Sequence, residues 1–70
     1  MNILHLDQNH PLLMAQLEAE GMTNVEDYSS SKFEIEKSIE NYDVIIIRSR
    51  FPIDKSFLQK ANNLKFIGRV

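Results

Sequence analysis

The residues best suited to chemistry in this sequence directly follow an apolar run. The stretch "DVIIIRSR" (43–50) ends in Arg48, Ser49 and Arg50 after four apolar side chains. Guanidinium groups bind carboxylate or phosphate through paired N–H donors, which Lys cannot reproduce. Arg69 stands near the end of a second apolar segment. The three arginines therefore predict an anion-binding pocket, if the fold brings both segments to one edge.

A plainer explanation of the same arginines stays open. Charged side chains often follow a buried strand simply because the chain has reached solvent there. On this explanation Arg48, Arg50 and Arg69 are ordinary surface charges. Residue types alone do not decide between the two explanations.

A turn cluster at 7–10 (DQNH) follows the first apolar segment and would line the same crevice. Asp7 is explained either by acidic chemistry or by turn formation. His10 is expected to begin a helix, and His5, inside a strand, to be a hydrogen-bonded structural residue. The 70 residues contain no pattern typical of a metal-ligand cluster, a nucleophile with its base or a Gly-rich phosphate loop. The sequence therefore predicts no catalytic residue, metal site or cofactor site within this chain.

Four strand-like segments determine where these side chains lie. The third is apolar throughout, which is typical of a strand buried on both faces of a parallel sheet, and the second is polar, which suits an edge. The predicted strands are 2–6, 23–29, 44–49 and 65–70.

Three helix patterns separate the strands, and each begins at a residue that can cap a helix. The order β-α-β-α-β-α-β predicts an α/β fold with a flavodoxin-like open parallel sheet, strand order 2-1-3-4. Ligands bind such sheets at the carboxyl ends of the strands, here between the first and third. No helix follows 65–70, so the sheet is expected to be incomplete at the C-terminus. The predicted caps are Asn9 or His10, Ser31 with Glu34, and Asp54.

Composition limits the class of partner. Seventy residues, 43% hydrophobic and 26% charged, make one small globular domain. A net charge of −2 favours neither nucleic acid nor an anionic membrane. The absence of Cys, of a signal peptide and of a membrane-spanning run makes a cytoplasmic location the expectation.

The segment "VIIIRSRFPIDKSFLQKANNLKFIGRV" (44–70) resembles the N-terminal part of the NAD-dependent D-2-hydroxyacid dehydrogenases. The resemblance is strongest to the members that oxidise 3-phosphoglycerate. In this family a buried strand ends in an R-S motif, a helix opened by Thr or Asp follows, and then come "L-K" and an "I-G-R" strand. The openings "MNILHLD" and "LLMAQLEAEG" also fit the family. The residues after Arg50, Phe51 and Pro52, depart from the small polar residue and the Lys or His that are common there.

The resemblance implies that residues 1–70 form the first part of a substrate-binding (lid) domain. Arg48 would bind the phosphate or carboxylate of an anionic 2-hydroxy acid substrate, with Ser49 beside it. Arg50 would add to the positive pocket, and Arg69 would lie at its edge. The family's Gly-rich turn, its NAD-binding Rossmann domain and its catalytic residues are absent from the 70 residues. The full-length parent is therefore expected to bind NAD and to form a homo-oligomer. The 70-residue fragment alone is expected to be inactive.

Two other classes compete with this interpretation. A phosphoacceptor receiver module needs Asp at the end of the third strand, but Arg48 stands there and Asp43 stands at the strand's start. A free-standing flavodoxin-like module, which binds an anion or a protein without catalysis, stays open. If the chain is a fragment, it is expected to self-associate through the uncovered segment 65–70 and neighbouring apolar helix faces, whereas a stable monomer would favour the module.

Overall fold

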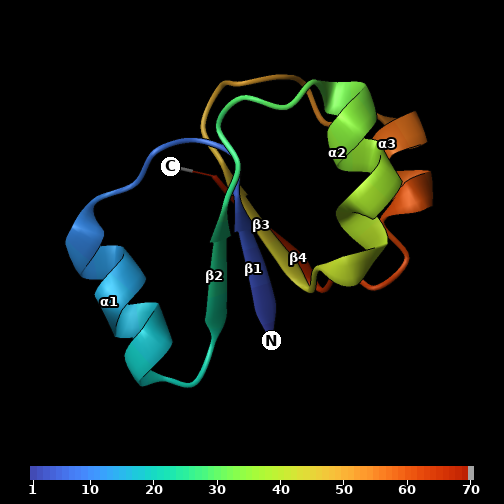
Figure 1. Ribbon diagram of the computed structural model, residues 1–70. Helices are drawn as coiled ribbons and strands as arrows, with labels where there is room; N and C mark the ends of the chain where they lie inside the picture. The colour runs from blue at the N-terminus through green and yellow to red at the C-terminus, as the bar shows by residue number, and fades with distance from the viewer. Residues whose placement is uncertain (70) are drawn as a thin grey trace.

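A four-stranded parallel sheet in the order β2-β1-β3-β4 forms the centre of the computed structural model, which describes residues 1–69 (Figure 1). The predicted element order, the parallel sheet and the strand order 2-1-3-4 are confirmed. The elements are β1 (Asn2–His5), α1 (Pro11–Ala19), β2 (Thr23–Glu26), α2 (Lys32–Ser38), the 3-10 helix η1 (Ile39–Asn41), β3 (Val44–Ile47), α3 (Lys55–Lys60) and β4 (Phe66–Arg69).

The register aligns the carboxyl ends of the strands. His5 of β1 pairs with Glu26 of β2 and with Ile46 of β3, and Ile47 pairs with Arg69 of β4. The chain leaves β1 toward β2 on one side and returns to β3 on the other. The loops that follow β1 and β3 therefore lie side by side at the switch point.

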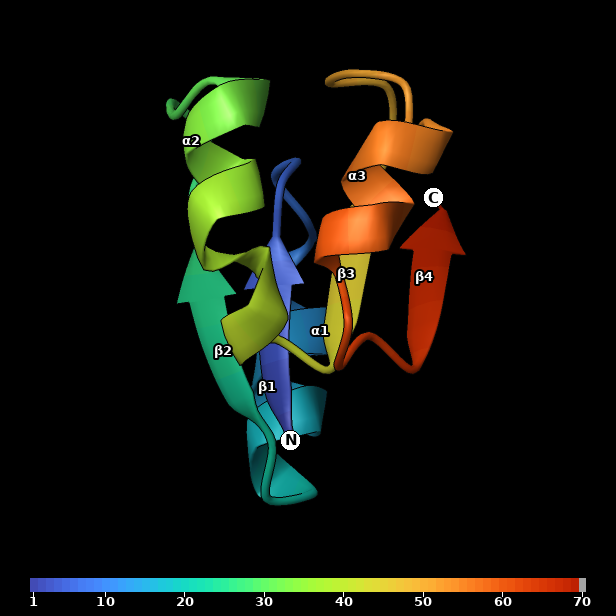
Figure 2. The same ribbon diagram turned by 90° about the vertical axis from the view of Figure 1, so that its right-hand side faces the viewer.

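The main core lies between the sheet and the pair α2 and α3, which cover the same face (Figure 2). Ile45 and Ile47 of the central strand β3 are fully buried, as the apolar run predicts. Burial of apolar surface contributes about 25 cal/mol per Å², so this face provides most of the stability. The core consists of Leu4, Leu6, Ile35, Ile39, Ile45, Ile47, Phe57 and Ala61.

The opposite face is covered less completely. Helix α1 lies on that side and packs beside β2 (Figure 1). Ile3 and His5 are buried there, whereas Phe66 of β4 is 58% exposed. The edge strand β4 thus presents apolar surface to solvent.

The helix starts follow the predicted caps, while some boundaries differ. His10, rather than Asn9, caps α1 by accepting a hydrogen bond from the Leu12 amide at 3.1 Å. The strand predicted at 23–29 ends at Glu26, because the Asp27 side chain folds the next residues into a turn. The strand predicted at 65–70 is β4, with Val70 outside the described residues. No helix in the part of the chain that the structure describes could cross a membrane.

Candidate functional site

The carboxylate of Asp7, in the turn after β1, meets the loop that follows β3. Its Oδ2 atom accepts hydrogen bonds from three successive backbone amides, those of Arg48, of Ser49 at 3.1 Å and of Arg50 at 3.3 Å. Consecutive amides that converge in this way form a nest, an arrangement that binds anions. The predicted meeting of the two loops at the switch point is therefore confirmed, and an internal carboxylate occupies the amides.

The pKa of Asp7 lies below its ordinary value. Partial burial acts to raise this pKa, but the amides of Arg48, Arg50 and Ser49 lower it, and so does the Arg48 charge. The lowering effects together exceed the effect of burial. Asp7 is therefore ionised at neutral pH, as an acceptor of three hydrogen bonds must be.

Arg48 presents its guanidinium to solvent. Within residues 1–69, one hydrogen bond tethers it, from Nη2 to the Gln8 carbonyl oxygen at 3.2 Å. Arg has five N–H donors, and the bond to Gln8 uses one of them. Among residues 1–69, no carboxylate forms an ion pair with Arg48. Ser49 beside it is also exposed, and the pair can bind an anion from solvent.

Arg50 has a different environment from Arg48. Its Nη1 atom donates to the carbonyls of Leu6, at 3.1 Å, and of Asp27, while Nη2 donates to the carbonyl of Ser30. Its side chain is 14% exposed and lies 3.8 Å from an Asp27 carboxylate oxygen. This guanidinium therefore joins the ends of β1 and β2 to the segment before α2. The prediction that Arg50 binds substrate stays a prediction.

Asp27 supports this junction with its side chain. Its carboxylate accepts hydrogen bonds from the backbone amides of Ser29 and Ser30, the latter at 2.9 Å. The pKa of Asp27 is lowered, chiefly by the Ser30 amide, with smaller contributions from the Ser30 hydroxyl, the Ser29 amide and the Arg50 charge, against an opposing effect of burial. The loop after β2 is thus held by charge-assisted hydrogen bonds.

Arg69 lies at the same edge of the sheet, paired in register with Ile47, the residue before Arg48. Its side chain is exposed. Within residues 1–69 the guanidinium of Arg69 makes no ion pair. The structure therefore brings Arg48, Ser49 and Arg50 around Asp7 and leaves Arg69 at the rim.

His5 is a structural residue, as predicted. It is fully buried, and its Nδ1 atom accepts a hydrogen bond from the side-chain Nδ2 atom of Asn9 at 2.9 Å. Its Nε2 atom must then carry the proton, which it donates to Asn24 Oδ1 at 2.7 Å. Asn24 in turn donates to the Met14 carbonyl of α1 at 3.0 Å. The network joins β1, β2 and α1 below the site.

Asp43 lies at the opposite, amino edge of the sheet. Its Oδ2 atom accepts a hydrogen bond from the Asn2 backbone amide at 2.8 Å, and its backbone carbonyl accepts one from the Lys65 amide. The position that a receiver module needs for its phosphoacceptor is held by Arg48. The geometry therefore excludes the receiver class.

The residues present do not fit a dinucleotide. The pyrophosphate of NAD needs glycines in the turn between a strand and a helix. Both glycines lie elsewhere, Gly21 after α1 and Gly68 within β4, and the β1–α1 turn carries Asn9, His10 and Pro11 instead. Over residues 1–69, no group of His, Cys, Asp and Glu could hold a metal ion.

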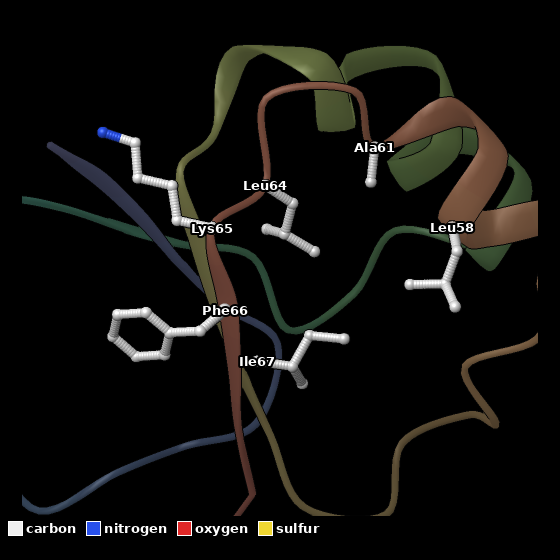
Figure 3. A pocket seen from close by; sticks show the side chains of 6 residues that line it. All are labelled: Leu58, Ala61, Leu64, Lys65, Phe66 and Ile67. Atoms are coloured by element: carbon white, nitrogen blue, oxygen red, sulfur yellow. The ribbon is translucent and has the colours of Figure 1, made fainter.

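A hollow that none of the arginines lines lies between α3 and the edge strand β4 (Figure 3). It has a volume of about 370 Å³. Ile67 points into it, whereas Phe66 points to the other side of the strand (Figure 3). Apart from Lys65 its lining is apolar, with Leu58, Ala61, Leu64, Phe66 and Ile67. None of these residues carries a carboxylate, imidazole, hydroxyl or thiol group.

Comparison with known proteins agrees with this fold. The chain is similar to the crystal structure of the PH0520 protein from Pyrococcus horikoshii OT3, with a TM-score of 0.87 and 20% identity. The match covers 97% of this chain and 20% of that one, so the chain spans about a fifth of that protein. A search of curated proteins gave no match. The family model of the D-isomer specific 2-hydroxyacid dehydrogenase catalytic domain matches residues 3–70. The chain therefore belongs to the D-isomer specific 2-hydroxyacid dehydrogenase family.

Proposed function

We propose that this chain is the N-terminal part of the substrate-binding domain of an NAD-dependent D-2-hydroxyacid dehydrogenase. The substrate is an anionic 2-hydroxy acid, and 3-phosphoglycerate, the substrate of D-3-phosphoglycerate dehydrogenase in serine biosynthesis, is the specific proposal. Arg48 and Ser49 bind its phosphate or carboxylate group.

One observation carries the proposal: the Arg48 guanidinium is exposed at the switch-point edge without a carboxylate partner among residues 1–69. A guanidinium binds phosphate or carboxylate in a bidentate fork, and α/β sheets bind ligands at this edge. The Ser49 hydroxyl adds a neutral donor next to it. Family membership supplies the reaction class.

Hydride transfer needs groups that these residues do not supply. The strand-to-helix turns here lack the glycines that a dinucleotide requires. In this proposal NAD binds to polypeptide outside residues 1–70, in the Rossmann domain of the full-length protein. The role of residues 1–70 is to hold the anionic end of the substrate, and the fragment alone is inactive.

Steady-state kinetics of the full-length protein test the proposal. Arg48→Ala should raise the KM for 3-phosphoglycerate about 10- to 100-fold, since a hydrogen bond to a charged group contributes roughly 1.5–3 kcal/mol. Lys37→Ala is the matched control, because it removes one exposed positive charge in the last turn of α2. Equal KM values for the two variants and the wild type would refute the assignment of Arg48.

A further inference from the structure

We propose that Asp7 is a positioning residue of the anion site: its carboxylate fills the amide nest of residues 48–50 and leaves the Arg48 guanidinium and the Ser49 hydroxyl as the donors offered to an external anion. The part that concerns the external anion rests on the proposed function. The part that concerns the nest stands on the geometry of Asp7 alone.

The nest would be a strong anion site if it were empty. Three successive amides converge on one oxygen atom, and hydrogen bonds from amides to a carboxylate are charge-assisted. Here the occupant comes from the chain itself. A substrate phosphate or carboxylate therefore has to bind through the side chains of Arg48 and Ser49.

Asp7 is itself held by the buried network. Asn9 donates to the Asp7 carbonyl at 3.1 Å and to His5 at 2.9 Å, and His5 is fully buried in β1. The buried strand β1 therefore fixes the position of the turn that carries Asp7. Through the hydrogen bonds of the nest, Asp7 in turn fixes the backbone of Arg48.

The side chain of Arg48 is tied to the same turn. Its Nη2 atom donates to the Gln8 carbonyl, next to Asp7 in the chain. Removing the Asp7 carboxylate therefore loosens the backbone that carries Arg48 without removing any donor that would contact the anion. An effect of Asp7 on anion binding would then be an effect of position.

Titration of the ¹⁵N-labelled 70-residue chain with inorganic phosphate, followed at the Arg48 side-chain resonance, tests the inference. Asp7→Ala should bind phosphate about tenfold more weakly, because small misplacements of a binding group are costly. Formate, a small carboxylate that fits the vacated space, should restore much of the affinity in this variant. The same formate added to the wild type should bring no gain.

The outcomes separate the two proposals. Wild-type affinity in Asp7→Ala, with weakened binding in Arg48→Ala, would overturn the positioning role and keep the proposed function. Wild-type affinity in Arg48→Ala would defeat the proposed function. If phosphate shifts the amides of residues 48–50 in Asp7→Ala and binds as tightly as in the wild type, the anion occupies the nest itself, which also overturns the inference.

A measurement on the wild type covers the case in which Asp7→Ala does not fold. During acidification, the amide resonances of residues 48–50 should move with the same midpoint as the Asp7 side-chain carbon. Arg48 and Arg50 keep their charge, and Asp27 is followed separately through its own amide partners, Ser29 and Ser30. Midpoints that differ between Asp7 and residues 48–50 would show that the Asp7 carboxylate does not fill the nest.

Discussion

Arg48 and Arg50 stand two residues apart, yet their guanidinium groups lie in different environments. Arg48 is exposed, and within residues 1–69 its guanidinium has one hydrogen-bond partner, the Gln8 carbonyl. The group of Arg50 is largely enclosed and donates to the carbonyls of Leu6, Asp27 and Ser30. The two arginines of one short motif therefore divide into a residue open to ligand and a residue that joins loops.

Arg50→Lys should destabilise the fold although it keeps the charge. One ammonium on a flexible stem cannot reproduce the planar fork that reaches three carbonyls, so buried acceptors lose their donors. Each such loss costs roughly 1–3 kcal/mol of the free energy of unfolding, which urea unfolding measures.

Arg69→Lys is the control for Arg50→Lys, because the Arg69 side chain is exposed at the end of β4. Its unfolding free energy should stay within about 0.5 kcal/mol of the wild type. Equal stability of the two variants would show that the junction around Arg50 contributes nothing.

Acid should weaken the loops at the carboxyl edge. The pKa values of Asp7 and Asp27 lie below the ordinary 3.8, so the folded state favours their ionised forms. Their stabilisation is complete above the pKa of the unfolded chain and is lost as the pH falls through the lower pKa of the folded chain.

The free energy of unfolding, measured between about pH 5 and pH 2, should therefore fall with decreasing pH. In Asp7→Asn the slope should be smaller, because the neutral amide no longer titrates. A variant with the full wild-type slope would contradict the role given to Asp7.

Phe57 and Leu58 differ sharply in burial although they are adjacent. Both are residues of α3: Phe57 is fully buried in the core, while Leu58 is 48% exposed beside the hollow. Phe57→Ala should lower the free energy of unfolding by about 3–5 kcal/mol, because it leaves a cavity in the core. Leu58→Ala should lower it much less, and a similar loss in both variants would contradict the described packing of α3.

The apolar spacing of the third helix pattern fits either Phe57 or Leu58, so helical periodicity alone did not choose between them. The choice depends on how α3 is rotated against Ile47 and Ile67, which is a property of tertiary packing. The strand order was predictable for the opposite reason. An apolar run such as 44–47 can lie only at the centre of the sheet, and the polar β2 only at its edge.

The edge position of Arg48 was also predictable, because it follows directly from the end of a buried strand. The role of Asp7 was not, since a turn-forming Asp and an Asp that reaches another loop look alike in sequence. The bonds of Arg50 depend on where the loops after β1 and β2 run. A contact between residues 7 and 48 could be found only from the fold.

The uncovered edge of β4 should cause the 70-residue chain to associate. Phe66 is 58% exposed on one side of this strand, and an apolar hollow lies on the other. Exposed strand edges and apolar patches favour pairing with another chain. Sedimentation of the wild type should therefore detect dimers or larger species.

Phe66→Lys should shift this equilibrium toward monomer, because it places a charge on the edge. Phe33→Lys is the matched control, since Phe33 is 62% exposed on α2, away from β4. A compact wild-type monomer, or equal effects of the two variants, would argue against association through β4.

In the proposed function, Arg48 is the residue at the carboxyl edge of the sheet that binds the anion. Titration of the 70-residue chain with 3-phosphoglycerate, monitored by NMR, measures this directly. We predict shifts at the Arg48 side chain and Ser49, and loss of these shifts in Arg48→Ala but not in Lys37→Ala. Saturable binding of the same affinity in Arg48→Ala, or shifts centred on the hollow between α3 and β4, would show that the anion binds without Arg48.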